Sequence, residues 1–252
     1  MSMRPDQAGE EKQAVFPSEP PDLREKGAPI NGTPQISERR LFVQLQVFRR
    51  SPQTDSLIEP LKELSLDTVL YHDLNNPDGV GLLMMSEDAA ELISEGRKLI
   101  ATPPFSSLQR EPAFTMTGRT YASGREADLE DWLLEKPRRT ALNPDWPWAI
   151  WYPLRRKPEF YLLPRQEAGK ILMEHARIGY SYAQGNYAHD IRLACFGMDP
   201  HDNEFVIGLM GPELYPLSHI VQEMRRTQQT AKYIASLGPF FVGKVCWQSG
   251  GR

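Results

Sequence analysis

Cysteine and histidine are scarce in this sequence, which limits the kinds of site that it can build. Two cysteines and five histidines occur among 252 residues. Cys195 and Cys246 both lie in apolar runs (RLACFG and GKVCWQ) that are typical of buried strands. We therefore expect reduced, buried thiols rather than a disulfide framework.

Long apolar runs and an excess of basic charge are also missing. No stretch of about 18 apolar residues could span a bilayer, and the N-terminal region lacks the apolar segment of a secretory signal. The net charge of −4 and the isoelectric point near 5.8 argue against general binding to nucleic acids. These absences predict a cytoplasmic protein that acts apart from membranes and nucleic acids.

Apolar residues are few in the first part of the chain. Residues 1–38 are rich in Pro, Glu, Lys, Gln and Gly, and such a segment cannot bury enough surface to offset the entropy of ordering it. We predict a disordered N-terminal arm at 1–38. The alternative is a tail that docks on a neighbouring subunit. The remaining length is enough for one large domain or two of about 100 residues.

Strand and helix patterns alternate after the arm. Apolar and polar residues alternate in LFVQLQVF, and TVLYHDL, VGLLMM and FTMTGRTY are further strand patterns. Helical spacing occurs at Ser56–Leu66 and in SEDAAELISEGRKLI. Further along the chain, NEFVIGLM predicts a strand, and residues 211–238 predict one long helix.

Two segments repeat the same strand-to-helix transition. VGLLMMSEDAAEL resembles VIGLMGPELYPL, and LIATPPF resembles YIASLGPFF, which favours an internal duplication. Each half has the β-α-β-β-α-β order of a ferredoxin-like unit, with helices on one face of an antiparallel sheet. We therefore predict an α+β fold with an N-terminal half at 39–146 and a C-terminal half at 147–252.

The most informative stretch of the chain is Trp151–Gly185. A strand with Tyr152 and two arginines precedes a helix that begins at Pro164, where proline suits the first turn. The apolar stripe of this helix follows helical spacing. Its members are Ile171, His175, Ile178 and Tyr182.

A histidine on a buried stripe has two interpretations. His175 could be a core imidazole that is hydrogen-bonded to a carbonyl. It could instead bind iron, because neutral imidazole is a common protein ligand of iron. No second His, Cys or carboxylate lies three or four residues away in a zinc-like arrangement. If His175 binds iron, a porphyrin must therefore supply the other ligands.

Several motifs occur in an order that resembles one family. They are WYP-x-x-R, FYLLP, MEH-x-x-IG-x-x-Y, GLM, EMRR and GPFFVG. Between Leu41 and Val245, and most strongly after Trp151, the chain resembles the chlorite dismutase superfamily. Within it, the chain most resembles the coproheme decarboxylases, or hydrogen-peroxide-dependent haem synthases. The resemblance implies two ferredoxin-like halves that form a dimeric α+β barrel, usually in a homopentamer.

The resemblance gives Tyr152 and His175 their expected roles. In the decarboxylases, the tyrosine of the YP pair is oxidised to a radical that attacks the substrate propionates, and chlorite-splitting members lack it. Tyr152 precedes Pro153 and lies 23 residues before His175, a spacing typical of the actinobacterial branch. His175 would be the proximal iron ligand. The alternative for Tyr152 is a strand tyrosine packed in the core.

The propionates of coproporphyrin need cationic or hydroxyl partners. Arg156, four residues after Tyr152, should lie on the same face of its strand. Thr230 stands where the family often has a propionate-binding serine. The alternative for each arginine is a solvated surface charge. The resemblance implies the set Arg138 (or Arg139), Arg156, Arg225 and Thr230.

The distal side of the expected site departs from the family. Chlorite-splitting relatives have an arginine, and one decarboxylase branch a glutamine, where this chain has Ala188, His189 and Asp190. We expect Arg192 to be out of register on its strand. His189 is the candidate base that deprotonates peroxide, or else a surface residue of a loop.

These features predict the peroxide-dependent decarboxylation of two propionates of coprohaem III, or iron coproporphyrin III, to give haem b. The substrates would be coprohaem and hydrogen peroxide, and a ferrochelatase is a partner by analogy only. One alternative is a haem peroxidase or chlorite-splitting member of the superfamily. The other is a non-catalytic haem-binding or haem-transfer protein.

Overall fold

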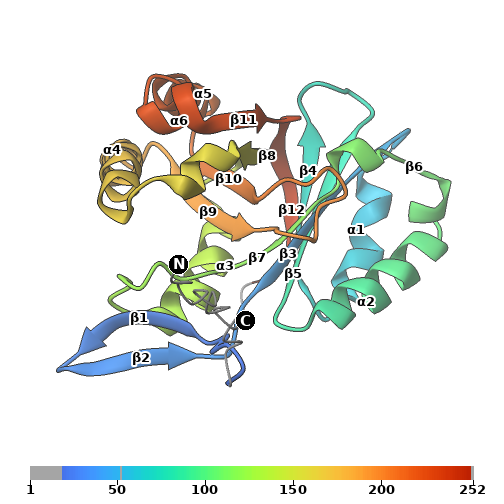
Figure 1. The fold of residues 1–252 in the computed structure, drawn as a ribbon. Coiled ribbons are helices and arrows are strands. Elements are labelled where there is room, and N and C mark those ends of the chain that lie inside the picture. The colour runs from blue at the N-terminus through green and yellow to red at the C-terminus, as the bar shows by residue number, and fades with distance from the viewer. Residues whose placement is uncertain (1–18, 52, 251–252) are drawn as a thin grey trace, which may run out of the picture.

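The strand patterns of the N-terminal half form four neighbouring strands of one sheet. The computed structural model describes residues 19–51 and 53–250, so residues 1–18 of the expected arm lie outside the described residues. The strands pair antiparallel in the order β7-β3-β5-β4 (Figure 1). They are β3 (Phe42–Arg49), β4 (Asp67–Asp73), β5 (Val80–Ser86) and β7 (Met116–Arg119).

Two helices cover one face of these strands. They are α1 (Asp55–Lys62) and α2 (Ala89–Ala101). Asp88 caps α2 by accepting a hydrogen bond from the Ala90 amide. Leu57 and Leu61 of α1 and Leu92 and Leu99 of α2 are buried in a cluster with the outer side chains of the strands.

The C-terminal half repeats the strand order. Its strands pair antiparallel in the order β12-β8-β10-β9, and β11 continues the β12 side of β8. This order corresponds strand by strand to the N-terminal half, which agrees with the expected duplication. The strands are β8 (Trp148–Arg156), β9 (His189–Ala194), β10 (Phe205–Gly211), β11 (Ile234–Leu237) and β12 (Phe241–Gln248). The predicted α+β class is confirmed.

The two four-stranded units join at both edges. β4 pairs with β12, and β7 pairs with β9 through Arg119 opposite Ala194. The pairings therefore return to their starting point, and we call this arrangement the strand circuit. Its inner face carries large, fully buried rings, including Tyr71, Trp151 and Phe241. A Cβ on Gly208 would lie 2.6 Å from the Trp151 ring, so only glycine fits there.

The long helix expected at 211–238 is wrong in its extent. The structure has α5 (Leu214–Met224), α6 (Gln228–Tyr233) and then strand β11. The Thr227 hydroxyl accepts a hydrogen bond from the Thr230 amide and caps α6. This local cap explains why the chain starts a second helix instead of extending the first.

The expectation of disorder up to residue 38 is also wrong in part. Strands β1 (Glu25–Ile30) and β2 (Thr33–Ser37) form an antiparallel hairpin. Asn31 and Gly32 have positive φ at its turn, as such turns require. The hairpin stands apart from the strand circuit in Figure 1.

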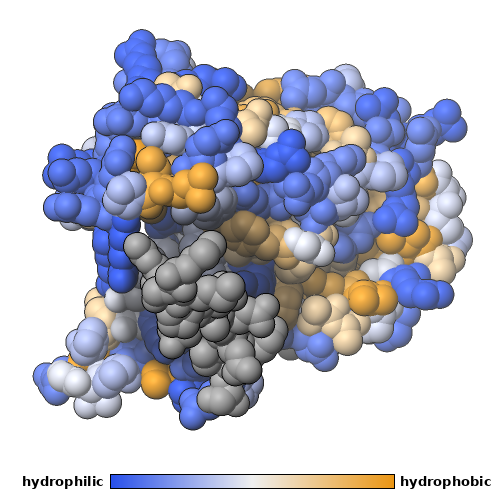
Figure 2. Space-filling view, in the orientation of Figure 1, coloured by the Kyte–Doolittle hydropathy of each residue, from blue (hydrophilic) through white to orange (hydrophobic). Residues whose placement is uncertain are grey.

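Hydrophilic residues dominate the helices at the upper left of the space-filling view, and apolar residues are more frequent toward its centre and right (Figure 2). No helix among the described residues is long and apolar enough to cross a bilayer.

Candidate functional site

The outer face of the C-terminal strands carries two of the predicted site residues, Tyr152 and Arg156. Tyr152 on β8 lies opposite Ile207 on β10, and Ile207 lies opposite Arg192 on β9. Side chains alternate between the two faces of a sheet, so these residues share the face that packs on the helices. The next row across the same strands consists of Ile150, Leu209 and Asp190.

His175 faces this surface from helix α4 (Arg165–Gln184). Its Nδ1 atom is buried and has no hydrogen-bond partner among the described residues. Burial, reinforced by the positive charges of Arg192 and Arg156, lowers the pKa of His175 to about 4. The imidazole is therefore neutral at physiological pH, which is the form that binds metals.

The inward side of α4 is only loosely packed. Ile171 is the one residue of this helix that is fully buried. Ile178 and Tyr182, on the same stripe as His175, are only partly buried against the cluster on the outer face of the sheet. A helix that completed its packing against the sheet would bury the whole stripe. The side of α4 that carries His175 is therefore not sealed.

Tyr152 is a buried phenol at the centre of the face. Its ring stacks on Phe240, with 4.7 Å between ring centroids. Burial raises the pKa of Tyr152 well above its usual value, the charge of Asp190 raises it further, and Arg225 opposes both. The phenol is therefore protonated at neutral pH. Asp190 and Arg225 both lie close enough to the Tyr152 phenol to change its pKa.

Arg156 is a cation of the same face whose side chain forms no ion pair among the described residues. Its guanidinium lies 4.7 Å from the Phe160 ring and 4.5 Å from the Phe205 ring. Its buried Nε has no hydrogen-bond partner within the part of the chain that the structure describes. The Glu204 carboxylate is near, but it accepts hydrogen bonds from the Tyr161 hydroxyl (2.6 Å) and the Arg156 amide. Such a guanidinium is suited to an anionic ligand.

Asp190 joins two cations at the edge of the face. Its carboxylate lies 2.8 Å from Arg192 Nε and 3.8 Å from Lys136 Nζ. Burial would raise the pKa of Asp190, but Arg192 and Lys136 outweigh it and hold the pKa below its usual value. Lys136 is the first residue of α3 (Lys136–Ala141). Both cations also lie against the Trp132 ring, at 4.0 Å and 5.1 Å.

The C-terminal end of α5 and the short helix α6 lie beside α4. The Gln228 amide donates to Glu174 Oε2 at 3.1 Å, so α6 docks on the turn that carries His175. Thr230 lies on this helix and is partly buried. Arg225 is exposed and follows α5. The structure thus brings Arg225 and Thr230 to the same side of the C-terminal half as His175.

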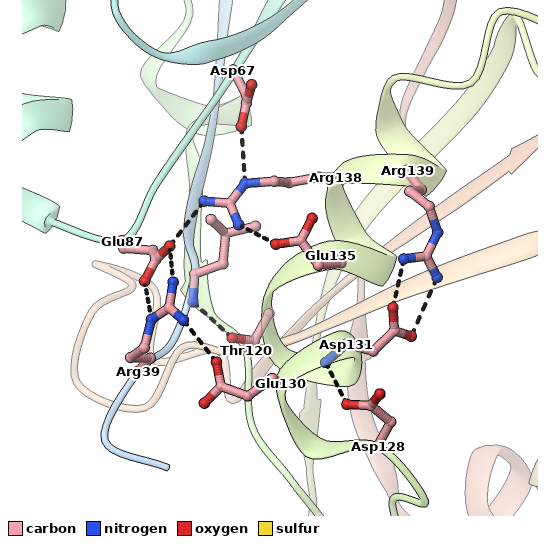
Figure 3. A network of polar contacts seen from close by, with 11 residues as sticks. Arg39, Asp67, Glu87, Thr120, Asp128, Glu130, Asp131, Glu135, Arg138 and Arg139 are labelled. Atoms are coloured by element: carbon pink, nitrogen blue, oxygen red, sulfur yellow. Dashed lines mark hydrogen bonds and ion pairs between the residues drawn. The ribbon is translucent and has the colours of Figure 1, made fainter. Parts of the chain in front are cut away.

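Arg138 and Arg139 are not brought to this face. Figure 3 shows both in a separate network of ion pairs. Arg138 lies 2.9 Å from Asp67 and 3.3 Å from Glu87, while Arg139 pairs with Asp131. Arg39 joins the same network through Glu87. These arginines therefore already have carboxylate partners.

His189 also lies apart from Tyr152. Its ring stacks on Trp146, with 3.6 Å between centroids, and its Nε2 contacts Asn186 Oδ1. Because side chains alternate along β9, His189 lies on the opposite face of the sheet from Asp190. Asp190, the next residue along the chain, lies on the face that carries Tyr152.

Sequence reasoning did not place Arg192 and Lys136 beside Asp190. Arg192 was expected to be out of register, but it lies in the same row as Tyr152. The alternation of HDIRLA on β9 is the signal that could have placed both Asp190 and Arg192 on one face. Lys136 is 54 positions away in the chain from Asp190, and no sequence pattern links them.

Among the described residues, no three His, Cys, Asp or Glu side chains are grouped to hold a metal ion.

Comparison with curated proteins finds a partial relative. The putative heme-binding protein VNG_2021C of Halobacterium salinarum is 33% identical over 105 residues, which cover 40% of this chain and 20% of that protein. The matched part is therefore about a fifth of the length of this relative.

Solved structures share the fold at low sequence identity. A heme-binding protein from Thermus thermophilus has a TM-score of 0.66 at 19% identity, over 82% of this chain and 91% of that chain. The chlorite dismutase of Candidatus Nitrospira defluvii in complex with imidazole has a TM-score of 0.65 at 12% identity, over 83% and 92%.

The family model described as chlorite dismutase matches residues 84–246, which are well over half of the chain. The match begins in β5 and ends in β12, so it includes β8, α4 and β9 with the residues of the candidate site. The chain belongs to the chlorite dismutase family.

Proposed function

We propose that this protein binds an iron porphyrin between α4 and the outer face of β8, β10 and β9. The observation that carries the proposal is His175, a neutral imidazole with a buried, unpartnered nitrogen on a loosely packed helix. The cations Arg192 and Arg156 lie near enough to lower its pKa. The names of two relatives as heme-binding proteins support the choice of ligand.

The described residues fit such a ligand. His175 would be the axial ligand, and the apolar residues of the face would contact the porphyrin plane. Arg156, Arg225 and Thr230 would hold propionates, because they offer charge or a hydroxyl on the same side of the C-terminal half. Arg138 is less suited to this role, since Asp67 and Glu87 already neutralise it.

We further propose that the ligand is coprohaem and that the reaction is the loss of CO2 from two of its propionates to give haem b. The bound iron porphyrin would supply the oxidising equivalents of hydrogen peroxide. For each propionate, one hydrogen peroxide would take up two electrons and two protons to give two waters, and the propionate would lose two electrons, one proton and CO2 to become a vinyl group. Tyr152 would give up an electron and a proton and recover them from the nearest propionate. Stacking on Phe240 fixes the phenol in place for this step. We expect a homopentamer, as the family resemblance implies, and a cytoplasmic location, as predicted from the sequence composition.

Mass spectrometry of the porphyrin tests the reaction. Coprohaem-loaded protein is titrated with hydrogen peroxide, for the unmodified chain, Tyr152→Phe and the control Tyr187→Phe, which changes a residue that is 55% exposed. We expect two successive losses of CO2 in the unmodified protein and the control, and none in Tyr152→Phe. If the unmodified protein binds coprohaem but only bleaches it, the decarboxylase proposal fails, and oxidation of a peroxidase dye would separate a peroxidase from a haem carrier.

Chlorite splitting is the second candidate, and the position of Arg192 favours it. This arginine lies in the same row of the sheet as Tyr152, and its positive charge lowers the pKa of His175. Oxygen evolution from chlorite by the haem-loaded protein would identify this activity, and its loss in Arg192→Gln would assign it to the arginine. Decarboxylation without oxygen evolution would exclude it.

A further inference from the structure

Asp190 occupies an unusual place among the charged groups of the site. It is a carboxylate on the outer face of β9, in the row next to Tyr152 and Arg192. A small cavity of about 20 Å³ lies beside it, lined also by Lys136, Arg192 and Trp132. This volume holds about one water molecule. The carboxylate therefore lies next to a space for a small polar molecule.

Charged and titratable groups face Asp190 from every element around it. Arg192 and Lys136 supply two positive charges, from β9 and α3. The negative charge of Asp190 raises the pKa of His175 on α4 and of Tyr152 on β8. It also raises the pKa of Tyr121, which follows β7. His189 also senses it from the other face of β9. Asp190 is the negative charge that the proposed iron ligand and the proposed radical site share.

A purely structural ion pair explains these contacts incompletely. The Asp190 and Arg192 side chains are 37% and 42% exposed, and ion pairs at that exposure contribute little to stability. The pairing also leaves one surplus cation, because a single carboxylate faces both Arg192 and Lys136. Two cations around one carboxylate keep it ionised and can stabilise a second, transient anion beside it.

We propose that Asp190 is the proton acceptor for a small neutral oxidant, hydrogen peroxide, in the site. The proton moves from a peroxide O–H to a carboxylate oxygen of Asp190. The products are the hydroperoxide anion and a protonated Asp190, and no electron is transferred in this step. Arg192 and Lys136 are positioning residues that orient the carboxylate and stabilise the new anion. This inference rests on the proposed porphyrin site, but not on decarboxylation.

Cyanide binding isolates the proton transfer from all later chemistry. Hydrogen cyanide is a small weak acid that must lose its proton as it binds to ferric haem. Protein loaded with ferric protoporphyrin is mixed with cyanide from about pH 5 to about pH 9, and the Soret shift gives the association rate. A positioned base is worth roughly 10²–10⁴-fold in such a step. We expect a nearly pH-independent rate in the unmodified protein. In Asp190→Asn, we expect a rate at least about 10²-fold lower at pH 6 that rises with the bulk cyanide anion.

Further variants separate a base from a merely structural carboxylate. Asp190→Glu should recover much of the rate at pH 6. Arg192→Gln removes the nearest cation, which raises the pKa of Asp190, so the rate should begin to fall at a higher pH than in the unmodified protein. Asp202→Asn, which removes an 89% exposed partner of Arg155, is the matched control.

The outcomes are distinct. An unchanged cyanide rate in Asp190→Asn overturns the inference and leaves the porphyrin site standing. Failure of the unmodified protein to bind porphyrin overturns both. If Asp190→Asn does not fold, the Arg192→Gln profile decides, because a structural ion pair predicts no shift of its acid limb.

Discussion

Arg156 and Arg138 were both expected to bind propionates, but the structure gives their side chains different partners. The buried Nε of Arg156 has no partner among the residues that the structure describes, whereas the Arg138 side chain pairs with Asp67 and Glu87. We predict that Arg156→Gln weakens coprohaem binding about 10–100-fold, because a charged hydrogen bond contributes roughly 1.5–3 kcal/mol. Arg138→Gln should leave this affinity unchanged and lower the free energy of unfolding by about 1–3 kcal/mol, since it leaves partly buried carboxylates unpaired.

Soret titration and urea unfolding of both variants measure the two quantities. Weaker coprohaem binding in Arg138→Gln, at unchanged stability, would return that arginine to the propionate site. Equal effects of both variants on affinity would contradict the assignment from the structure.

Side-chain direction decides which site residues could be predicted from the sequence. Tyr152 and Arg156 are four positions apart on one strand, so strand alternation places them on one face. His175 follows from helical spacing in the same way. His189 and Asp190 are adjacent, and a shift of one residue in register exchanges their faces. The ion partners of Arg138 lie on β4 and after β5, and no local pattern shows such distant contacts.

At the scale of elements, the loop that ends at Glu126 holds the N-terminal hairpin. Glu126 is 8% exposed, and its carboxylate accepts hydrogen bonds from Ser123 Oγ and from the amides of Ser123, Gly124 and Arg125. The Glu126 carbonyl accepts from the Ala28 amide of β1 and from Gln35 of β2. The order of the hairpin therefore depends on the order of this loop.

We predict that the Glu126 carboxylate contributes pH-dependent stability. Burial alone would raise its pKa, but the hydrogen bonds from Ser123 and the neighbouring amides hold the pKa below its usual value. The unfolded chain thus takes up the proton first as pH falls. The contribution is complete above the ordinary glutamate pKa of about 4.3 and disappears as pH falls through the lower folded value.

Glu126→Gln should lower the free energy of unfolding by about 1–3 kcal/mol at pH 7, and this difference should shrink below about pH 4. Urea unfolding at several pH values measures it, and faster proteolysis of the hairpin should accompany it. Glu59→Gln, at an exposed ion pair on α1, should change stability by less than about 0.5 kcal/mol. A difference that is the same at about pH 3.5 and at pH 7 would refute the linkage.

Periodicity predicted most elements, and local caps and distant contacts decided the rest. The strand patterns of β3, β4, β5 and β10 are strong, because buried alternation is a local property of the chain. The break between α5 and α6 depends on one capping threonine, Thr227. The hairpin within 25–37 depends on Gln35, which donates to the carbonyls of Glu126 and Ala127 far along the chain.

At the scale of the whole molecule, the two halves meet at two unequal seams. The β4–β12 seam has a register from Asp73 opposite Gly243 to Val69 opposite Gln248. The β7–β9 seam has the single pair of Arg119 and Ala194. The internal duplication in the sequence does not indicate how many residues pair at each seam. From the sequence alone, the two seams are therefore expected to be alike.

The short seam depends on close approach at Gly118. A Cβ on this glycine would lie 2.7 Å from Leu193 Cβ, so Gly118→Ala must push β7 and β9 apart. Overpacking of this kind costs about 1–3 kcal/mol. We predict faster amide exchange in β7 and β9 with unchanged protection in β4 and β12, measured by hydrogen exchange with mass spectrometry.

Gly96→Ala on α2, whose Cβ would lie 3.6 Å from Met84 Cε, is the control and should be neutral or stabilising by up to about 1 kcal/mol. Because β9 carries Asp190 and Arg192, Gly118→Ala should also slow cyanide binding to the haem-loaded protein, while Gly96→Ala should not. Loss of protection at both seams together would instead show that the strand circuit opens as one unit.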